Sequence, residues 1–173
     1  MSISPTTSTD TRNHIVQFDT AMGRAAVSWS NSGLTALWLP PCEVAAQDPT
    51  HEMPEFVKEA IQRAQLHLAG TLQSFDDLPV DLSNTREFTR KVYDKVRTIA
   101  NGNVLTYGDV AKELGKPNGA RAVGHAMARN PLPLVIPCHR VVAKDGGLGG
   151  FSAPGGIQTK RRLLHMEGAI LPD

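Results

Sequence analysis

The residues best suited to do chemistry form an adjacent pair, Cys138 and His139. A cysteine attacks carbon as its thiolate, and a neighbouring imidazole with a carboxylate behind it is a general way to remove the thiol proton. Three prolines bracket the apolar run before the pair and fix its backbone; they are Pro131, Pro133 and Pro137. The pattern predicts a rigidly presented cysteine nucleophile with His139 as its base, acting directly or through a water.

The other cysteine and histidines form no comparable site. With Cys42 the chain has two cysteines, too few for a disulfide framework, and we expect both to be free thiols. The six histidines, at positions 14, 51, 67, 125, 139 and 165, form no CxxC or HxxxH cluster, so the spacing predicts no metal. An isolated Cys-His pair is more often a buried thiol beside a surface histidine, so the surroundings must decide.

Charge is distributed unevenly along a chain whose net charge is only +1. Residues 1–85 hold four Lys/Arg against ten Asp/Glu, a net charge of −6, whereas residues 86–173 hold fourteen against seven, a net charge of +7. The basic half suits contact with a nucleic acid, although a solvated basic face would look the same. No apolar stretch approaches the roughly 18 residues of a membrane span, so we expect no membrane association.

The first half of the chain is expected to fold as a small α/β lobe. Residues 1–13 are Ser/Thr-rich and predict a disordered tail, not a secretion signal. Three β-type runs with turn-forming residues between them predict an antiparallel sheet; they cover residues 14–18, 25–29 and 34–39. Apolar residues at helical spacing predict a helix over 55–69, ended by Gly70. With a connecting segment at 71–83, the lobe spans 14–83.

The second half, residues 84–173, is expected to be a mostly helical lobe that carries the active-site cysteine. The fold class is therefore α/β, of the α+β kind. Asn84, with Glu87 three residues later, predicts the capped start of a helix that runs to the turn at Asn101-Gly102.

A helix-turn-helix unit is predicted just before the Cys138 segment. Thr106 and Asp109 form a capping-box pattern for a short helix that ends at Gly115, and Asn118 is expected to cap a second helix. Basic side chains recur every fourth residue on the second helix, with small residues between them; they are Arg121, His125 and Arg129. Such a thin, basic helix suits a nucleic-acid groove, although two short helices that merely pack together would show the same pattern.

The stretch from Arg121 to Val142, RAVGHAMARNPLPLVIPCHRVV, resembles the active-site signature of the O6-alkylguanine-DNA alkyltransferases, in which PCHRV follows a turn containing Asn-Pro. The likeness covers nearly the whole chain: TYG at 106–108 matches the start of that family's helix-turn-helix, and GFS at 150–152 and RRLLHMEG at 161–168 match its pocket loop and terminal helix. It implies direct reversal of O6-alkylguanine in duplex DNA by irreversible, single-use transfer of the alkyl group to the protein after base flipping.

The resemblance assigns a role to each matching residue. Cys138 corresponds to the alkyl acceptor, His139 to its water-linked base, and Glu167 to the carboxylate that orients the histidine. Tyr107 corresponds to the tyrosine that crowds the target phosphate and protonates the guanine leaving group, and Asn130 to the hinge before the active-site strand. The implied DNA contacts are Arg121, which fills the space left by the flipped base, with Tyr107, His125 and Arg129. The implied guanine pocket is formed by Met127, the carbonyl of Val141, Phe151 and Ser152.

A few positions depart from the family pattern. Phe151 lacks the hydroxyl of the usual tyrosine and cannot make its hydrogen bond. His125 stands where a small or amide residue is commoner, and ANGN at 100–103 replaces a frequent PYG turn. The zinc ligands of some relatives have no counterpart, so the resemblance implies neither a metal nor another cofactor. Cys42 has no matched role.

The resemblance implies the activity of a methylated-DNA–[protein]-cysteine S-methyltransferase, with O4-alkylthymine as a further substrate left open. The alternative is an alkyltransferase-like protein that marks damaged bases without transfer, but those proteins have tryptophan in place of the cysteine. A Cys-His hydrolase would turn over repeatedly, and a transcription factor would bind undamaged sites tightly. The expected partner is double-stranded DNA containing alkylated guanine, bound by a monomer with cooperativity left open. The expected location is the cytoplasm, on the nucleoid in a bacterium, or the nucleus in a eukaryote.

Overall fold

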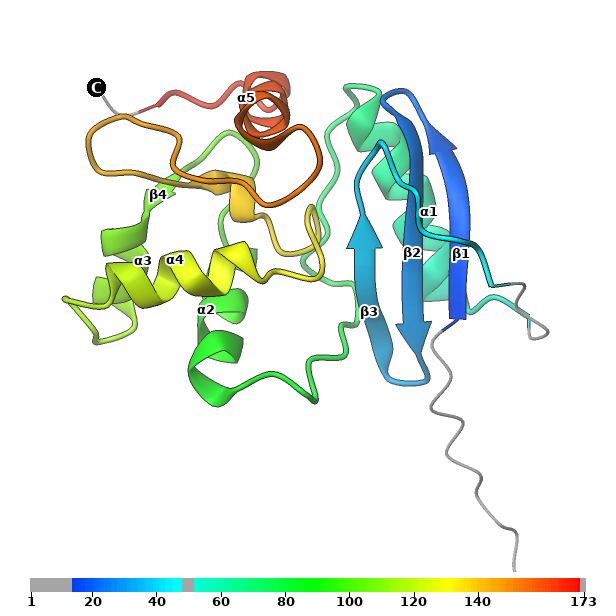
Figure 1. Ribbon diagram of the computed structural model, residues 1–173, viewed down its shortest axis with the longest axis horizontal. Coiled ribbons are helices and arrows are strands. Elements are labelled where there is room, and N and C mark those ends of the chain that lie inside the picture. The colour runs from blue at the N-terminus through cyan, green and yellow to red at the C-terminus, as the bar shows by residue number, and fades with distance from the viewer. Residues whose placement is uncertain (1–13, 48–51, 172–173) are drawn as a thin grey trace, which may run out of the picture.

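The computed structural model describes residues 14–47 and 52–171. The expected tail at 1–13 lies outside this part of the chain. A sheet with one helix packed against it stands beside a group of shorter helices (Figure 1). Within the described residues, no helix is long and apolar enough to cross a membrane.

The N-terminal half is an antiparallel sheet with a helix packed on it, which confirms the sequence prediction. Its strands are β1 (His14–Thr20), β2 (Gly23–Ser30) and β3 (Gly33–Trp38), in that spatial order. Helix α1 (Glu55–Leu68) packs against β1 and β2. Its buried face comprises Val57, Ala60, Ala64, His67 and Leu68. One imidazole thus lies on an otherwise apolar helix face.

The C-terminal half consists of short helices and one pair of two-residue strands. Its elements are α2 (Glu87–Arg97), β4 (Leu105–Thr106), α3 (Tyr107–Glu113), α4 (Ala120–Ala128), the 3-10 helix η1 (Cys138–Arg140), β5 (Val141–Val142) and α5 (Gly156–Met166). The predicted capping box of α3 is confirmed, since the Asp109 N–H donates to the Thr106 hydroxyl at 3.0 Å and the Thr106 N–H donates to the Asp109 carboxylate at 3.0 Å. Helix α3 packs on α4, as expected for the two helices of the predicted helix-turn-helix.

Two expected helix caps are wrong. Asn84 lies in a turn two residues before the N-cap position of α2, and Asn118 lies in a turn closed by a hydrogen bond from the Gly119 N–H to the Lys116 carbonyl, 2.7 Å. Neither helix has a side-chain hydrogen bond at its N-cap. In both cases a turn precedes the helix, and it carries the asparagine out of reach of the first helical N–H groups.

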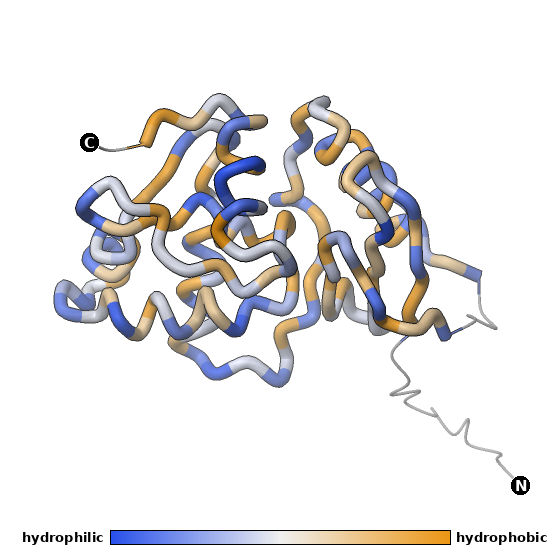
Figure 2. The backbone as a smooth tube through the Cα atoms, turned by 45° about the horizontal axis from the view of Figure 1, so that its top comes forward, coloured by the Kyte–Doolittle hydropathy of each residue, from blue (hydrophilic) through white to orange (hydrophobic). Residues whose placement is uncertain are grey.

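A continuous hydrophobic core joins the two halves. Apolar side chains from the sheet, α1, α2, α4 and the segment before Cys138 belong to one buried cluster. Figure 2 shows that hydrophobic stretches of the backbone occur in both halves. Backbone bonds reinforce it: Leu34 pairs with the 79–81 segment through Pro79 and Asp81, and the Leu37 N–H donates to the Pro131 carbonyl at 2.8 Å. The sheet therefore braces the loop that leads to Cys138. A lobe boundary near Ser83 stays a prediction.

The contact between β3 and the 79–81 segment can be tested at Gly33. A Cβ at this position would lie 2.7 Å from the Pro79 carbonyl carbon, whereas a Cβ on Gly70 would have no described atom within 4 Å; both residues have positive φ. We expect Gly33→Ala to lower the free energy of unfolding by about 1 to 3 kcal/mol more than Gly70→Ala, because backbone atoms must move apart. Chemical denaturation of both variants measures the difference, and equal losses would refute this contact.

Candidate active site

The Cys138 thiol is presented by a tightly braced loop. The side chain of Asn130 clamps this loop, since its Nδ2 donates to the Ile136 carbonyl at 2.7 Å and its Oδ1 accepts from the Leu132 N–H at 2.9 Å. Leu134 has a φ of 71°, a conformation that non-glycine residues adopt rarely and only when their surroundings impose it. These contacts support the predicted rigid presentation of Cys138, which stays a prediction.

The family likeness implied that Cys138 lies in a strand. In the structure it is instead the first residue of a 3-10 turn. The turn is closed by the Arg140 N–H, which donates to the Pro137 carbonyl at 2.9 Å. Strand pairing begins only after it, where Val141 is paired with Leu105. Proline has no N–H with which to extend a strand ladder backward, which accounts for the difference.

A cavity of about 450 Å³ opens at the thiol. Its lining comes from α3, α4, η1 and the loop before α5, and consists of Tyr107, Gly124, Met127, Ala128, Cys138, Gly150, Phe151 and Ser152. This volume lies in the range of small-molecule sites. The structure thus brings four predicted pocket or leaving-group residues to the predicted nucleophile: Tyr107, Met127, Phe151 and Ser152.

Behind the thiol lies a buried carboxylate network. His139 Nε2 is 2.8 Å from Glu167 Oε1, and Arg140 donates to both carboxylate oxygens, from Nε and Nη2, at 2.9 Å each. All three side chains are buried. With a carboxylate on Nε2, the proton of neutral His139 sits on that nitrogen and the lone pair on Nδ1. Nδ1 is buried and forms no hydrogen bond with a described residue, so no direct bond joins it to Cys138.

The network keeps Glu167 ionised. Burial alone would raise the pKa of this carboxyl group, but hydrogen bonds from His139, His67 and Arg140 outweigh it and hold the pKa well below its ordinary value. The orienting group is thus a carboxylate at every pH at which the protein acts.

The thiol and its base are both neutral at rest. Burial raises the pKa of the Cys138 thiol above its ordinary value, against smaller opposite effects of the Asn130 hydrogen bond and the Lys160 charge. Burial likewise lowers the pKa of His139, and Glu167 offsets only part of this effect. The resting form of Cys138 is therefore the thiol, and not the thiolate that attacks carbon. The proton must leave Cys138 when an electrophile is in place.

Lys160 is a site residue that the sequence reasoning missed. It is fully buried, and its Nζ donates to the carbonyls of Val141 at 2.7 Å and Gly150 at 3.2 Å. Burial lowers its pKa to about 8, and a negative charge on Cys138 would oppose this shift. A signal was present in the sequence, because Lys160 precedes the buried Leu163 and Leu164 by one helical turn and shares their face.

Val141 takes a different place from the one expected. It is fully buried and does not line the cavity, and its carbonyl already accepts a hydrogen bond from Lys160. A carbonyl oxygen has a second lone pair, so contact with a ligand is not blocked. In the structure, the Val141 carbonyl anchors the Lys160 ammonium group.

Tyr107 is positioned to act as a proton donor at the cavity. Burial, and to a smaller extent Cys138, raises the pKa of its phenol, so the hydroxyl stays protonated at neutral pH. The Lys160 Nζ lies 5.7 Å from the centre of its ring. A Cβ on Gly149 would lie 2.5 Å from the hydroxyl oxygen, so glycine at this position leaves the room that the phenol needs.

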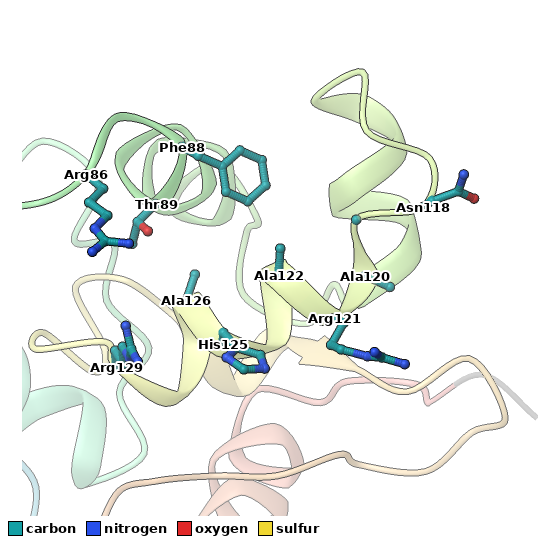
Figure 3. Close-up of a pocket in the computed structure, with 11 residues that line it drawn as sticks. Arg86, Phe88, Thr89, Asn118, Ala120, Arg121, Ala122, His125, Ala126 and Arg129 are labelled. Atoms are coloured by element: carbon teal, nitrogen blue, oxygen red, sulfur yellow. The ribbon is translucent and has the colours of Figure 1, made fainter.

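The basic residues predicted to contact DNA lie outside the cavity, along a neighbouring groove. Arg121 and His125 on α4, and Arg129 at its C-cap, are exposed and border this open groove of about 1020 Å³ between α4 and the start of α2. Figure 3 shows Arg86, which the sequence analysis missed, on the opposite side of this groove. The groove is larger than the Cys138 cavity, and no cysteine is among the residues that line it. Its basic rim suits a polyanion better than a reacting small molecule.

No described group of three or more His, Cys, Asp or Glu side chains is arranged to hold a metal ion. His51 lies outside the described residues.

Comparison with known proteins gives one consistent family. Residues 87–169 match the family described as 6-O-methylguanine DNA methyltransferase, DNA binding domain. The chain is 38% identical over 145 residues to the methylated-DNA–protein-cysteine methyltransferase of Methanothermobacter thermautotrophicus, covering 84% of this chain and 80% of the relative. It is 34% identical over 161 residues to the protein of that name from Mycobacterium bovis, covering 92% and 94%.

Solved structures agree with the sequence relatives. The crystal structure of Mycobacterium tuberculosis OGT in complex with DNA has a TM-score of 0.73 and 33% identity, and the match covers 89% of this chain and 92% of that one. The O6-methylguanine-DNA methyltransferase of Pyrococcus kodakaraensis has a TM-score of 0.66 and 26% identity, with 91% and 100% covered.

The charge on Lys160 should set the reactivity of Cys138 toward a small neutral thiol reagent. Lys160→Met removes a cation that favours the thiolate, so at pH 7 we expect labelling on the order of ten-fold slower. Lys160 is protonated below its pKa of about 8 and neutral above it, so the difference from the unaltered protein should shrink as pH rises through that value. The control is Lys144→Met, an exposed lysine. A deficit that is independent of pH would exclude this electrostatic role.

Proposed function

The chain belongs to the methylated-DNA–protein-cysteine methyltransferase family, and we propose that Cys138 is its alkyl acceptor. The protein binds DNA and repairs it by direct reversal, moving an alkyl group from O6-alkylguanine to a cysteine of its own chain. One observation carries the assignment to Cys138: its thiol lines a base-sized cavity and stands beside the buried His139–Glu167 pair. Cys42 is far from Cys138 in sequence and lies in a loop, where its backbone N–H donates to the Arg24 carbonyl.

The reaction starts from the neutral thiol and imidazole. When the flipped base fills the cavity, Nδ1 of His139 takes the Cys138 proton through a bridging water, and Glu167 stabilises the imidazolium that forms. The thiolate attacks the alkyl carbon, so that the S–C bond forms as the bond between carbon and guanine O6 breaks. The hydroxyl of Tyr107 supplies a proton to the departing guanine and regains one from His139. In the net reaction, the Cys138 thiol loses one proton and guanine gains one.

The product bond explains the single use of the protein. A thioether, unlike a thioester, has no carbonyl that water can attack, so Cys138 is not regenerated and one chain repairs one lesion. Cys138 also disfavours the alternative of a binding protein without transfer, because such proteins carry tryptophan at this position.

Recognition of the duplex is proposed to run along α4. Arg121 enters the stack in place of the flipped base, and the other exposed basic residues, His125 and Arg129, contact the backbone. We further propose that the protein acts as a monomer. Its site of action follows from its substrate: the cytoplasm, on the nucleoid of a bacterium, or the nucleus of a eukaryote.

Transfer should be limited to one alkyl group per chain. Because Cys138 is both reactant and product, a duplex with labelled O6-methylguanine should give a single burst, with the label on Cys138 by mass spectrometry and none in Cys138→Ser. A Cys42→Ser variant should transfer normally. Repeated turnover, or label on Cys42, would contradict the assignment.

Arg121 and Arg129 should separate base flipping from initial DNA contact. Unstacking a base costs a few kcal/mol, so Arg121→Ala should slow transfer from duplex DNA more than transfer from the free modified base. Arg129→Ala, on the same exposed face, should instead weaken binding and flatten its salt dependence through the loss of a phosphate contact. Single-turnover rates on both substrates and titrations at several salt concentrations test this. An equal loss of the Arg121→Ala rate on the two substrates would remove Arg121 from flipping.

A further inference from the structure

The buried carboxylate of the active site has a partner in the other half of the molecule. His67, on the last turn of α1, places its Nε2 at 3.0 Å from Glu167 Oε1, and both side chains are fully buried. Glu167 follows α5, and Figure 1 shows the end of α1 on the side of the molecule where α5 lies. One hundred residues separate the two groups in sequence. The reaction described above gives His67 no task.

The protonation of His67 is set by its second nitrogen. The backbone N–H of Gln73 donates to Nδ1 at 3.1 Å, so Nδ1 carries a lone pair. Nε2 must then carry the ring proton, and it donates this proton to Glu167. His67 is thus a neutral, directed hydrogen-bond donor, and the loop after α1 holds it in this form.

With His67 in place, the acceptor capacity of Glu167 Oε1 is filled. Oε1 accepts from His67 Nε2, His139 Nε2 and Arg140 Nη2, and Oε2 accepts from Arg140 Nε. Each carboxylate oxygen offers about two lone-pair sites, so Oε1, with three donors, is crowded, whereas Oε2 has one. His67 and His139 share one oxygen, and each therefore limits how strongly the other is bound.

We propose that His67 is a positioning residue for alkyl transfer, through which the N-terminal half holds Glu167 in the orientation that leaves the His139 lone pair on Nδ1. The inference rests on the proposed function of Cys138. By sharing Oε1, His67 weakens the pull of the carboxylate on the His139 proton and keeps the base neutral. Without it, Glu167, which Arg140 still holds in place, accepts only the His139 and Arg140 donors at Oε1 and binds His139 more tightly, so that the imidazole holds its proton more strongly.

Three substitutions distinguish the donor role of His67 Nε2 from the acceptor role of Nδ1. His67→Gln places an amide N–H where Nε2 lies and keeps the donor to Glu167. His67→Asn places a carbonyl where Nδ1 lies and keeps the acceptor for Gln73 but not the donor. His67→Phe keeps neither and retains a ring to lie edge-on to Phe75, whose centre is 5.5 Å away.

Single-turnover transfer from an O6-methylguanine duplex, at saturating DNA and below the melting temperature of every variant, tests the proposal. We expect His67→Asn and His67→Phe to transfer about ten-fold more slowly with unchanged DNA affinity, and His67→Gln to stay within about three-fold of the unaltered chain. In the two slow variants the acid limb of the pH–rate profile should move to higher pH, because His139 then holds its proton more tightly. The glutamine variant should restore it.

Each outcome decides one question. Lower melting temperatures with an unchanged pH profile would show that His67 only packs, and a His67→Gln variant as slow as His67→Asn would show that its bond to Glu167 does not matter; either result overturns the proposal. The unaltered chain is measured in the same assay, so absence of transfer to Cys138 there would instead sink the proposed function.

Discussion

The need to satisfy one buried carboxylate organises this protein. An ionised carboxylate away from water costs several kcal/mol unless its oxygens are paired. Glu167 meets this requirement with donors from two distant parts of the chain, α1 and the turn at 138–140. Arg140 extends the network, since its guanidinium also donates to the Ile99 carbonyl and the Asn101 side chain at 2.5 Å each. The end of α2 and the catalytic turn must therefore meet at α5 before the carboxylate is stable.

The same burial explains how the thiol can be reactive yet safe. In a dry site, charge separation between Cys138 and His139 is unfavourable until a ligand compensates for it. Both groups therefore stay neutral, as the directions of their pKa shifts require. A nucleophile that can be used only once benefits from this arrangement, because a permanent thiolate would react with any electrophile that reached it. Burial thus limits the reaction to a ligand that fills the cavity.

Local signals in the sequence predicted the elements and the reacting pair. The strand turns, the Thr106–Asp109 capping box and the Pro-braced Cys-His pair depend on residues within a few positions of one another. The caps at Asn84 and Asn118 failed because a competing turn of similar composition precedes each helix. His67 and Lys160 were missed for a different reason. Each lies on the apolar face of a helix, where a polar residue signals a buried partner, but the partner is set by tertiary contacts alone.

Only a short loop connects α4, the helix proposed to contact DNA, with the Cys138 thiol. Helix α4 ends at Ala128, Asn130 clamps the loop that follows, and the thiol comes eight residues after that clamp. The loop has little freedom, because Leu134 is held in a strained conformation and β3 donates to Pro131. In the proposed mode of DNA binding, α4 is followed directly by a loop that the sheet fixes at Pro131. Such a loop can hold Cys138 still while the helix engages DNA, which is what transfer to an extruded base demands. The N-terminal half accordingly serves as the support against which the DNA-binding half works, at the backbone of β3 and at the carboxylate of Glu167.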